Sequence, residues 1–459
     1  MSHKVESFGI GSLLEGYDTG RFTPAEVVNV VYDRIDTYGD KAVWITLVSR
    51  EDALVRAAQL QSGFRDRRAS MTLYGIPFSV KDAIDVAGYP TTMACPSFAY
   101  LADETAVVVR RILDAGGIFV GKTNLDQFGL GLVGNRSPYG TPRCVYDPDH
   151  VSGGSSSGSA VSVAASLVSF SVATDMAGNT LVPAALNGIV AFKPTLGTLS
   201  TVGLVPTCRA FDCVAIAAKS TEDLRTAWVV MKSYDEDDIF SRASLPLWPR
   251  AWRPDACRFG TPPEDLLARL PPDYRRLFDA AANAMVMSLG LERSKSFDYA
   301  PFHDAGQMYP NSSLAAQNPA ALEDFIAEHG AEELHPATRD ILAASRFDAV
   351  QAYRDLFAVQ YHRRRAELQY RDNIDVLLVP STVVHPTADE IYENPTWGDE
   401  VMGAFTHFIN LLDLCAVAVP AGVWRNSRGA VMPFGVIVIG QAGTDEGLLE
   451  LGSRLTDVL

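Results

Sequence analysis

The sequence lacks the patterns that mark several common functional classes. Its six cysteines contain no CxxC pair, so we expect buried or incidental thiols in a reducing compartment rather than a disulfide framework. Its eight histidines show no HxxxH or HxH spacing, and no metal site is expected. We expect the glycine-rich loops to follow neither the phosphate-loop pattern GxxxxGK[ST] nor a GxGxxG pattern between a strand and a helix, so nucleotide binding is not expected. We therefore expect neither a metal nor a cofactor.

An excess of positive charge is also missing. The chain has 39 lysines and arginines against 55 aspartates and glutamates, a net charge of −16, which disfavours nucleic acid and anionic membranes as partners. The longest apolar run, residues 160–173, is interrupted by serines and is too short to span a bilayer. The N-terminal MSHKVESFGIG has no apolar signal core. We expect a cytoplasmic protein with a small-molecule partner, no nucleic-acid or membrane partner, and a homodimer as one compatible assembly.

What is present predicts a large α/β fold. Hydrophobic residues make up 47% of the 459, enough for a substantial core, and large α/β enzymes can form one unit at this length. Thr23-Pro24 predicts a helix start, and residues 75–80 predict a buried strand that ends at Lys81. Helical and strand patterns then alternate, which supports an α/β sheet. Later in the chain we expect helices over 337–369, 401–414 and 444–459, and strands over 375–380 and 417–420.

The most informative stretch is residues 151–193, VSGGSSSGSAVSVAASLVSFSVATDMAGNTLVPAALNGIVAFK. Glycines let a backbone approach a ligand closely, and clustered hydroxyls are candidate proton carriers or nucleophiles. A flexible linker is disfavoured because the loop leads directly into apolar segments. GGSSSGSA, TDMAG and VPAALNGIVAFKPTLG, with GIPFSVKDAIDVAGYPTT upstream, resemble the amidase-signature family. NLDQFGLGLVGNRSPYG and PFGVIVIG resemble its allophanate hydrolase type.

This resemblance implies the fold and its extent. It implies an amidase-signature fold, a large mixed β-sheet core covered by α-helices on both faces. We expect one domain over residues 1–459, with a signature core over about 70–215 and a less regular half over about 220–459. Full-length allophanate hydrolases often continue into a further C-terminal domain, which we expect to be absent here.

The resemblance also implies a Ser–Ser–Lys relay. It assigns the lysine to Lys81, the bridging serine to Ser155 and the nucleophile position to Asn179, and the spacings of 74 and 24 residues fit such a relay. A lysine at the end of an apolar strand is by itself most often a surface residue; with the family match, a buried lysine of lowered pKa is favoured. A cis peptide bond entering Ser155 is implied as well. The oxyanion hole is expected in the backbone of Asp175, Met176, Ala177 and Gly178.

The sequence departs from the family pattern in three places. Asn179 cannot be an ordinary nucleophile, because its amide nitrogen is not basic. The family continues with glycine and arginine where this chain has Thr180 and Leu181, and the Thr180 hydroxyl, displaced by one residue, is a poor substitute. Residues 310–318, PNSSLAAQN, lack the tyrosine and arginine that bind the substrate carboxylate in allophanate hydrolases. The predicted substrate-binding residues are Gly131, Ser156, Thr180, Leu181, Tyr309 (as a shifted tyrosine) and Asn318 (at the arginine position).

Three functions are compatible with these residues. The one we favour is an enzyme repurposed for non-covalent acid–base chemistry on a small amide- or urea-like molecule, through Lys81, Ser155 and the oxyanion loop. The second is a working amidohydrolase of a small carboxamide or urea compound, in which Thr180 or a water oriented by Asn179 replaces the serine. The third is a catalytically inactive pseudo-amidase that acts as a scaffold or partner subunit.

Overall fold

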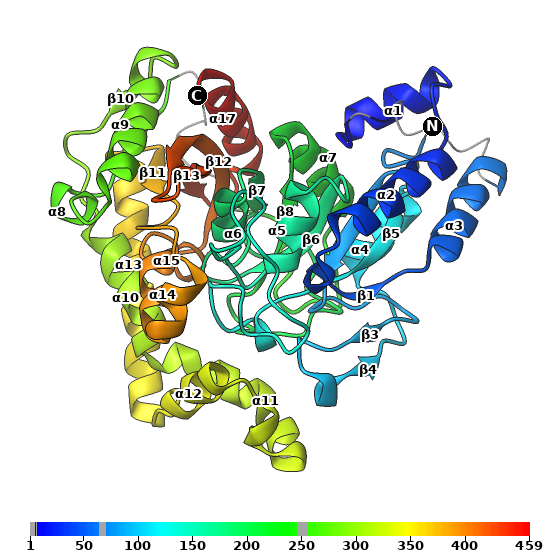
Figure 1. Cartoon of the computed structure of the whole chain (residues 1–459). Helices are drawn as coiled ribbons and strands as arrows, with labels where there is room; N and C mark the ends of the chain where they lie inside the picture. Colours follow the sequence, from blue (N-terminus) through cyan, green and yellow to red (C-terminus); the bar gives the residue numbers. More distant parts are fainter. Residues whose placement is uncertain (1–4, 6, 64–69, 246–252, 254–255) are drawn as a thin grey trace.

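The computed structural model describes residues 5, 7–63, 70–245, 253 and 256–459. Within this part of the chain, eleven strands form one sheet (Figure 1). In spatial order they are β1 (Trp44–Leu47), β5 (Ile118–Thr123), β2 (Pro77–Lys81), β6 (Phe170–Asp175), β8 (Cys213–Ala218), β7 (Val190–Lys193), β12 (Leu414–Arg425), β13 (Val431–Gln441), β11 (Val376–Pro380), β9 (Arg258–Gly260) and β10 (Glu292–Arg293). A separate two-stranded sheet pairs β3 (Pro90–Thr91) with β4 (Tyr100–Leu101).

The large sheet is mixed. Strands β5, β2 and β6 run parallel, the strands from β6 to β11 are antiparallel to their neighbours, and β11, β9 and β10 are parallel again. Every residue of β2, β5, β8 and β11 is buried. Strands that are covered on both faces read as continuous apolar runs rather than alternating ones. The expected α/β fold with a mixed sheet is confirmed.

Helices cover both faces of this sheet (Figure 1). They are α1 (Ile10–Asp18), α2 (Pro24–Tyr38), α3 (Arg50–Gly63), α4 (Val107–Asp114), α5 (Ser157–Ala164), α6 (Leu181–Leu186), α7 (Thr221–Met231), α8 (Glu264–Leu267), α9 (Pro272–Met287), α10 (Ala300–Asn311), α11 (Gln317–His329), α12 (Pro336–Ala344), α13 (Ala349–Asp372), α14 (Ala388–Glu393), α15 (Pro395–Gly403), α16 (Phe408–Leu411) and α17 (Asp445–Val458). None of the helices in the described ranges is both long enough and apolar enough to cross a membrane.

Local sequence signals place some helix boundaries correctly and others wrongly. Thr23 caps α2 in a reciprocal capping box with Glu26, as the sequence suggests. The single helix predicted over 337–369 is wrong, because the chain breaks between α12 and α13. There Asp348 accepts the N–H of Gln351 and starts a new helix. The helix predicted over 401–414 is also wrong: α15 and α16 are separate, and Leu414 already begins β12.

The order of the strands gathers the predicted site. β2 and β6 are parallel neighbours, with Phe78 opposite Phe170 and Val80 opposite Val172. Their carboxyl ends therefore lie at the same edge of the sheet, which brings Lys81 close to the last residues of β6. Ligand sites of open α/β sheets commonly lie beyond the carboxyl ends of the strands.

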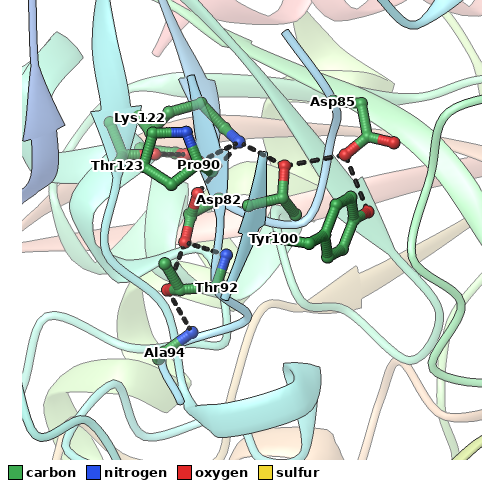
Figure 2. Close-up of polar contacts among 10 residues, drawn as sticks. Asp82, Asp85, Pro90, Thr92, Ala94, Tyr100, Lys122 and Thr123 are labelled. Atoms are coloured by element: carbon green, nitrogen blue, oxygen red, sulfur yellow. Dashed lines mark hydrogen bonds and ion pairs between the residues drawn. The ribbon is translucent and has the colours of Figure 1, made fainter. Parts of the chain in front are cut away.

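The expectation that no segment follows the phosphate-loop pattern is wrong, although the segment that matches it does not form a phosphate loop. Residues 116–123, GGIFVGKT, match GxxxxGK[ST], yet most of this segment is the buried strand β5. The Lys122 Nζ atom lies 2.9 Å from Asp82 Oδ1 and donates to Thr91 Oγ1 at 2.9 Å (Figure 2). Asp82 Oδ2 in turn accepts from the N–H of Thr92 at 2.9 Å. This buried ion pair ties β5 to the end of β2 and to the loop beyond it.

Candidate functional site

Lys81, the last residue of β2, is fully buried. Its Nζ donates to Ser155 Oγ at 2.7 Å and to Thr174 Oγ1 at 2.7 Å. Burial lowers the pKa of Lys81 to about 7, and the nearby carboxyls of Asp175, Asp126 and Asp212 oppose part of that effect. The amine can therefore accept a proton near neutral pH.

Ser155 follows a tightly packed glycine pair just before α5. The peptide bond between Gly154 and Ser155 is cis, as the family resemblance implied. A Cβ on Gly154 would collide with Asp126 Oδ2 and with the backbone of Gly134, so a larger residue would displace this loop. Asp126 itself accepts the N–H of Gly134 at 2.9 Å. The loop thus holds the Ser155 hydroxyl against Lys81, with only 1% of the residue exposed.

Asp175 organises the turn that follows β6. Its Oδ1 accepts the N–H of Gly178 at 2.8 Å, and its Oδ2 accepts the N–H groups of Thr180 at 2.7 Å and Leu181 at 3.1 Å. Burial raises the pKa of Asp175, whereas these backbone donors act in the opposite direction. The carboxyl group thereby fixes the conformation of residues 175–181.

Both polar atoms of the Asn179 side chain form hydrogen bonds within the protein. Oδ1 accepts the backbone N–H groups of Met176 at 3.2 Å and Ala177 at 3.0 Å. Nδ2 lies within hydrogen-bonding distance of Ser155 Oγ (3.0 Å), Gly131 O (3.1 Å) and Gly129 O (3.3 Å). Two N–H groups of the predicted oxyanion hole therefore already have an acceptor inside the protein. A continuous chain of hydrogen bonds runs from Lys81 through Ser155 to Asn179.

A cavity of about 200 Å³ lies against Asn179. Its lining residues come from widely separated parts of the sequence: Leu130, Gly131, Leu132, Ala177, Asn179, Tyr309, Ala315, Asn318, Ile341, Ala344, Ser345, Asp399 and His407. Lys81 and Ser155 are not among them. Because Asn179 lines the cavity and also contacts Ser155, its side chain separates the cavity from the serine and the lysine.

The structure brings only some of the predicted substrate-binding residues to this cavity. Gly131, Tyr309 and Asn318 line it. The other three are buried outside its lining: the hydroxyls of Ser156 and Thr180 lie 3.3 Å apart, Thr180 Oγ1 donates to Thr174 O at 2.8 Å, and Leu181 is fully buried at the start of α6.

The sequence did not indicate most of the remaining lining residues, and two of these carry titratable side chains, Asp399 and His407. Asp399 Oδ2 lies 2.5 Å from the guanidinium of Arg136, and Asp399 Oδ1 accepts the N–H of Leu132 at 2.9 Å. The ring of His407 lies 5.3 Å from that of Tyr309, and burial lowers the pKa of His407 to about 4. Neither residue belongs to a spaced motif, so no sequence signal marked them.

Two further polar residues brace the turn from outside. Thr406 Oγ1 donates to Ala177 O at 2.6 Å. Asn410 Nδ2 donates to the backbone oxygens of Asp175 and Phe211, both at 2.8 Å. These contacts connect the segment around α16 to the turn, a long-range link that periodicity cannot indicate.

Comparisons with known proteins cover nearly the whole chain. Residues 26–449 match the family model described as Amidase. The chain is 37% identical to the urea amidolyase of Saccharomyces cerevisiae over 426 residues, which are 90% of this chain and 22% of that protein. It is 36% identical to the urea amidolyase of Lachancea kluyveri over 441 residues, 95% of this chain and 24% of that protein. The chain thus spans less than a quarter of the length of these two relatives.

A solved structure shares the fold. Selenomethionine-substituted allophanate hydrolase of Kluyveromyces lactis superposes with a TM-score of 0.88 at 34% sequence identity, covering 98% of this chain and 72% of that one. The family match extends over both the site and the sheet that positions it. The chain therefore belongs to the amidase family and is related to allophanate hydrolase.

Proposed function

We propose that this chain binds a small molecule without hydrolysing it through an acyl-enzyme, because Asn179 takes the place of the nucleophilic serine. The observation that carries the proposal is the double engagement of the Asn179 side chain, with Oδ1 on the N–H groups of Met176 and Ala177 and Nδ2 on Ser155. A ligand carbonyl that approached those N–H groups would have to displace Oδ1. The amide nitrogen cannot attack a carbonyl in its stead.

The cavity supports a ligand that is small and uncharged. Apolar side chains from Leu130, Leu132 and Ile341 line it together with a few polar groups, the usual composition of a small-molecule pocket. Among its described lining residues there is a carboxylate, Asp399, and no lysine or arginine. A buried anion without a cationic partner is strongly unfavourable. These features favour a neutral amide- or urea-like molecule over a carboxylate such as allophanate.

The test is ligand binding with a matched pair of variants on α12. Ala343 and Ala344 are both exposed, but Ala344 lines the cavity and Ala343 does not. Small carboxamides and substituted ureas should raise the melting temperature of the wild-type protein saturably. Ala344→Phe should abolish that shift, and Ala343→Phe should retain it. Intact-mass measurement should detect no covalent adduct during binding. A thermal shift that survives Ala344→Phe, or an acyl adduct, would contradict the proposal.

One observation favours a second candidate, non-covalent acid–base chemistry. Lys81, with its pKa near 7, is linked to the cavity residue Asn179 by two hydrogen bonds through Ser155. If ligand binding at Asn179 changes the protonation state of Lys81 through Ser155, the proton is exchanged with solvent, and binding is accompanied by proton uptake or release between pH 6 and 8. Calorimetry in buffers of different ionisation enthalpy measures this. Under this candidate, the wild-type protein should exchange protons on binding and Lys81→Met should not. If the protein only binds the ligand, neither the wild type nor Lys81→Met should exchange protons.

The remaining two functions correspond to other outcomes of the same experiments. Ammonia released from a bound carboxamide would establish a working amidohydrolase. Absence of any saturable ligand, with the fold intact, would favour a scaffold or partner subunit.

A further inference from the structure

A second, smaller cavity lies between the C-terminal half of α13, the start of β12 and the end of β13. Its volume is about 130 Å³, and none of its lining residues belongs to the cavity against Asn179. Charged, polar and apolar side chains line it, among them Arg363, Glu367, Asp413, Gln441, Ala366 and Leu412. We call this space the α13–β13 cavity.

The guanidinium of Arg363 has unused donors beside this cavity. Within the described part of the chain it donates one hydrogen bond, from Nε to Leu411 O at 2.5 Å, although a guanidinium carries five N–H donors. Burial lowers the pKa of Arg363, and the carboxylate of Asp413 opposes that effect. A carboxylate in the cavity would be a favourable partner, because arginine binds carboxylates through two parallel hydrogen bonds.

Two further lining residues each have a buried polar atom without a hydrogen-bond partner among the described residues. These atoms are Nε2 of Gln441, a residue that is 9% exposed, and Oδ1 of Asp413. The other carboxylate oxygen, Asp413 Oδ2, lies 2.8 Å from Arg242 Nη1. A buried polar group that lacks a partner is costly to the fold. One atom is a donor and the other an acceptor, so a ligand would need both functions to satisfy them.

The charges of the lining favour a ligand that carries both signs. Arg363 and Gln441 supply hydrogen-bond donors that suit a carboxylate, and Asp413 and Glu367 supply acceptors that suit an ammonium group. Glu367 Oε2 lies 3.0 Å from Arg364 Nη1, in a pair that is largely exposed, and its second oxygen is left for a ligand. A ligand with a single charge would leave one set of these groups without a partner.

The volume limits the size of the ligand. An apolar cavity of about 150 Å³ in a protein interior can hold benzene, which has six non-hydrogen atoms. The α13–β13 cavity, at about 130 Å³, therefore has room for about five or six. Glycine has five non-hydrogen atoms and alanine has six, and both are zwitterions near neutral pH.

We infer that the α13–β13 cavity is a second ligand site, and that it binds a small α-amino acid of the size of glycine or alanine. The ligand carboxylate accepts from the free Nη–H groups of Arg363 and from Gln441 Nε2. The ligand ammonium donates to Asp413 Oδ1 and to Glu367. Each of the two buried atoms without a partner gains one in this arrangement.

The second site is connected to the turn that carries Asn179. Arg363 holds Leu411 O, and Leu411 packs in one cluster with Ala177. The neighbouring Asn410 Nδ2 donates to Asp175 O at 2.8 Å. A ligand that fixes the guanidinium of Arg363 therefore also holds α16 against the turn, and it should reduce the opening of residues 175–181.

Isothermal titration calorimetry of the wild-type chain tests the class of ligand. Glycine and L-alanine should bind saturably, with one site per chain. Acetate and methylamine each carry only one of the two charges and should bind about tenfold more weakly or less. L-Phenylalanine is too large for the cavity and should not bind. No saturable binding of glycine and L-alanine, or acetate binding as tightly as glycine, would overturn the inference.

Matched variants test the position of the site. Gln441→Met keeps the length of the side chain but removes its donor, and it should weaken glycine binding about tenfold. Gln307→Met is the control, because Gln307 is exposed on α10 and lines neither cavity, and it should bind glycine as the wild type does. An unchanged melting temperature without ligand shows that each variant is folded. Glycine affinity that is unaffected by Gln441→Met would overturn the assignment.

Two further measurements separate this site from the cavity against Asn179. Ala344→Phe, which fills that cavity, should leave glycine binding unchanged, and loss of binding in this variant would place the ligand there instead. Amide hydrogen exchange of residues 175–181 should slow when glycine is bound. Exchange that stays the same at saturating glycine would contradict the connection to the turn. None of these outcomes depends on what the cavity against Asn179 binds.

Discussion

The Oδ1 atom of Asn179 accepts the backbone N–H of Ala177 at 3.0 Å, within the same turn. The N–H of Met176 joins this contact at 3.2 Å. An oxyanion hole is effective because its N–H donors are free and point to the position where negative charge develops on the substrate. Here an amide oxygen of the protein already satisfies them. If these N–H groups form the oxyanion hole that the family resemblance implies, Asn179 Oδ1 occupies the position that a substrate carbonyl oxygen would take.

Replacing Asn179 should free the N–H groups of Met176 and Ala177. We expect Asn179→Ser to react with a fluorophosphonate probe that does not label the wild-type protein, because a hydroxyl would stand beside Ser155 and Lys81 while the Met176 and Ala177 N–H groups become free. Intact-mass spectrometry measures the adduct. Asn179→Ala frees the same donors without supplying a nucleophile and should stay unlabelled. Labelling of Ser155 or Lys81 in the wild-type protein would show that the Asn179 side chain does not block the probe from reaching them.

The same variant should not acquire allophanate turnover. Leu181 and Asn318 provide no cation for the substrate carboxylate, and among the described lining residues the charged group is Asp399. An unpaired anion in a buried site is strongly disfavoured. Ammonia release from allophanate by Asn179→Ser measures this, and efficient turnover would mean that another part of the protein binds the carboxylate.

Lys81 should give the protein a distinctive dependence of stability on pH. Its pKa is lowered in the fold to about 7, below that of the unfolded chain, because burial disfavours the ammonium form. The unfolded state therefore binds more protons between about pH 7 and 10.5, and the stability contributed at this site rises with pH across that window. The rise is at most about 5 kcal/mol.

Lys81→Met should lack this rise and should be more stable than the wild type near pH 7. Denaturant unfolding of both proteins at several pH values isolates the difference, since all other titrating groups are shared. Parallel stability curves for the two proteins would contradict a lysine of lowered pKa.

His407 should make the protein sensitive to acid. Burial lowers the pKa of His407 to about 4, although the facing carboxylate of Asp399 opposes the shift. Below about pH 6.5 the unfolded chain binds a proton that the folded chain excludes, so stability falls as the pH drops toward 4, by at most about 3 kcal/mol. His407→Gln should flatten this decline in thermal melts. An unchanged slope would place the acid sensitivity elsewhere.

Substitutions of Lys122 and Asp82, the buried ion pair of Figure 2, should have coupled effects on the free energy of unfolding. Both Lys122 and Asp82 side chains are fully buried, 2.9 Å apart. Lys122→Met leaves the Asp82 carboxyl without its cation and should cost about 3–5 kcal/mol of unfolding free energy. Adding Asp82→Asn should recover part of this loss, because the uncompensated charge is removed. A double variant that is less stable than Lys122→Met would show that the Asp82 carboxylate is held mainly by other donors.

Features that depend on residues close together in the sequence could be predicted from it, and features that depend on long-range packing could not. The capping box at Thr23 and the apolar strand before Lys81 depend on residues that are neighbours in the sequence, so both were predictable. The meeting of Lys81, Ser155 and Asn179 came from motif resemblance, and the parallel pairing of β2 with β6 explains it. Asp399 and His407 approach the cavity only through long-range packing, which no periodicity reveals. The break before α13 was missed because apolar residues continue across it.

Ammonia release under single-turnover conditions, with the wild-type protein in excess over allophanate or a neutral carboxamide, tests the central claim most directly. We expect no release above that of a protein-free control, because Asn179 supplies no nucleophile and its side chain accepts the N–H groups that would otherwise polarise the scissile carbonyl. Release at an ordinary enzymatic rate, on the order of 1–10³ s⁻¹, would contradict it.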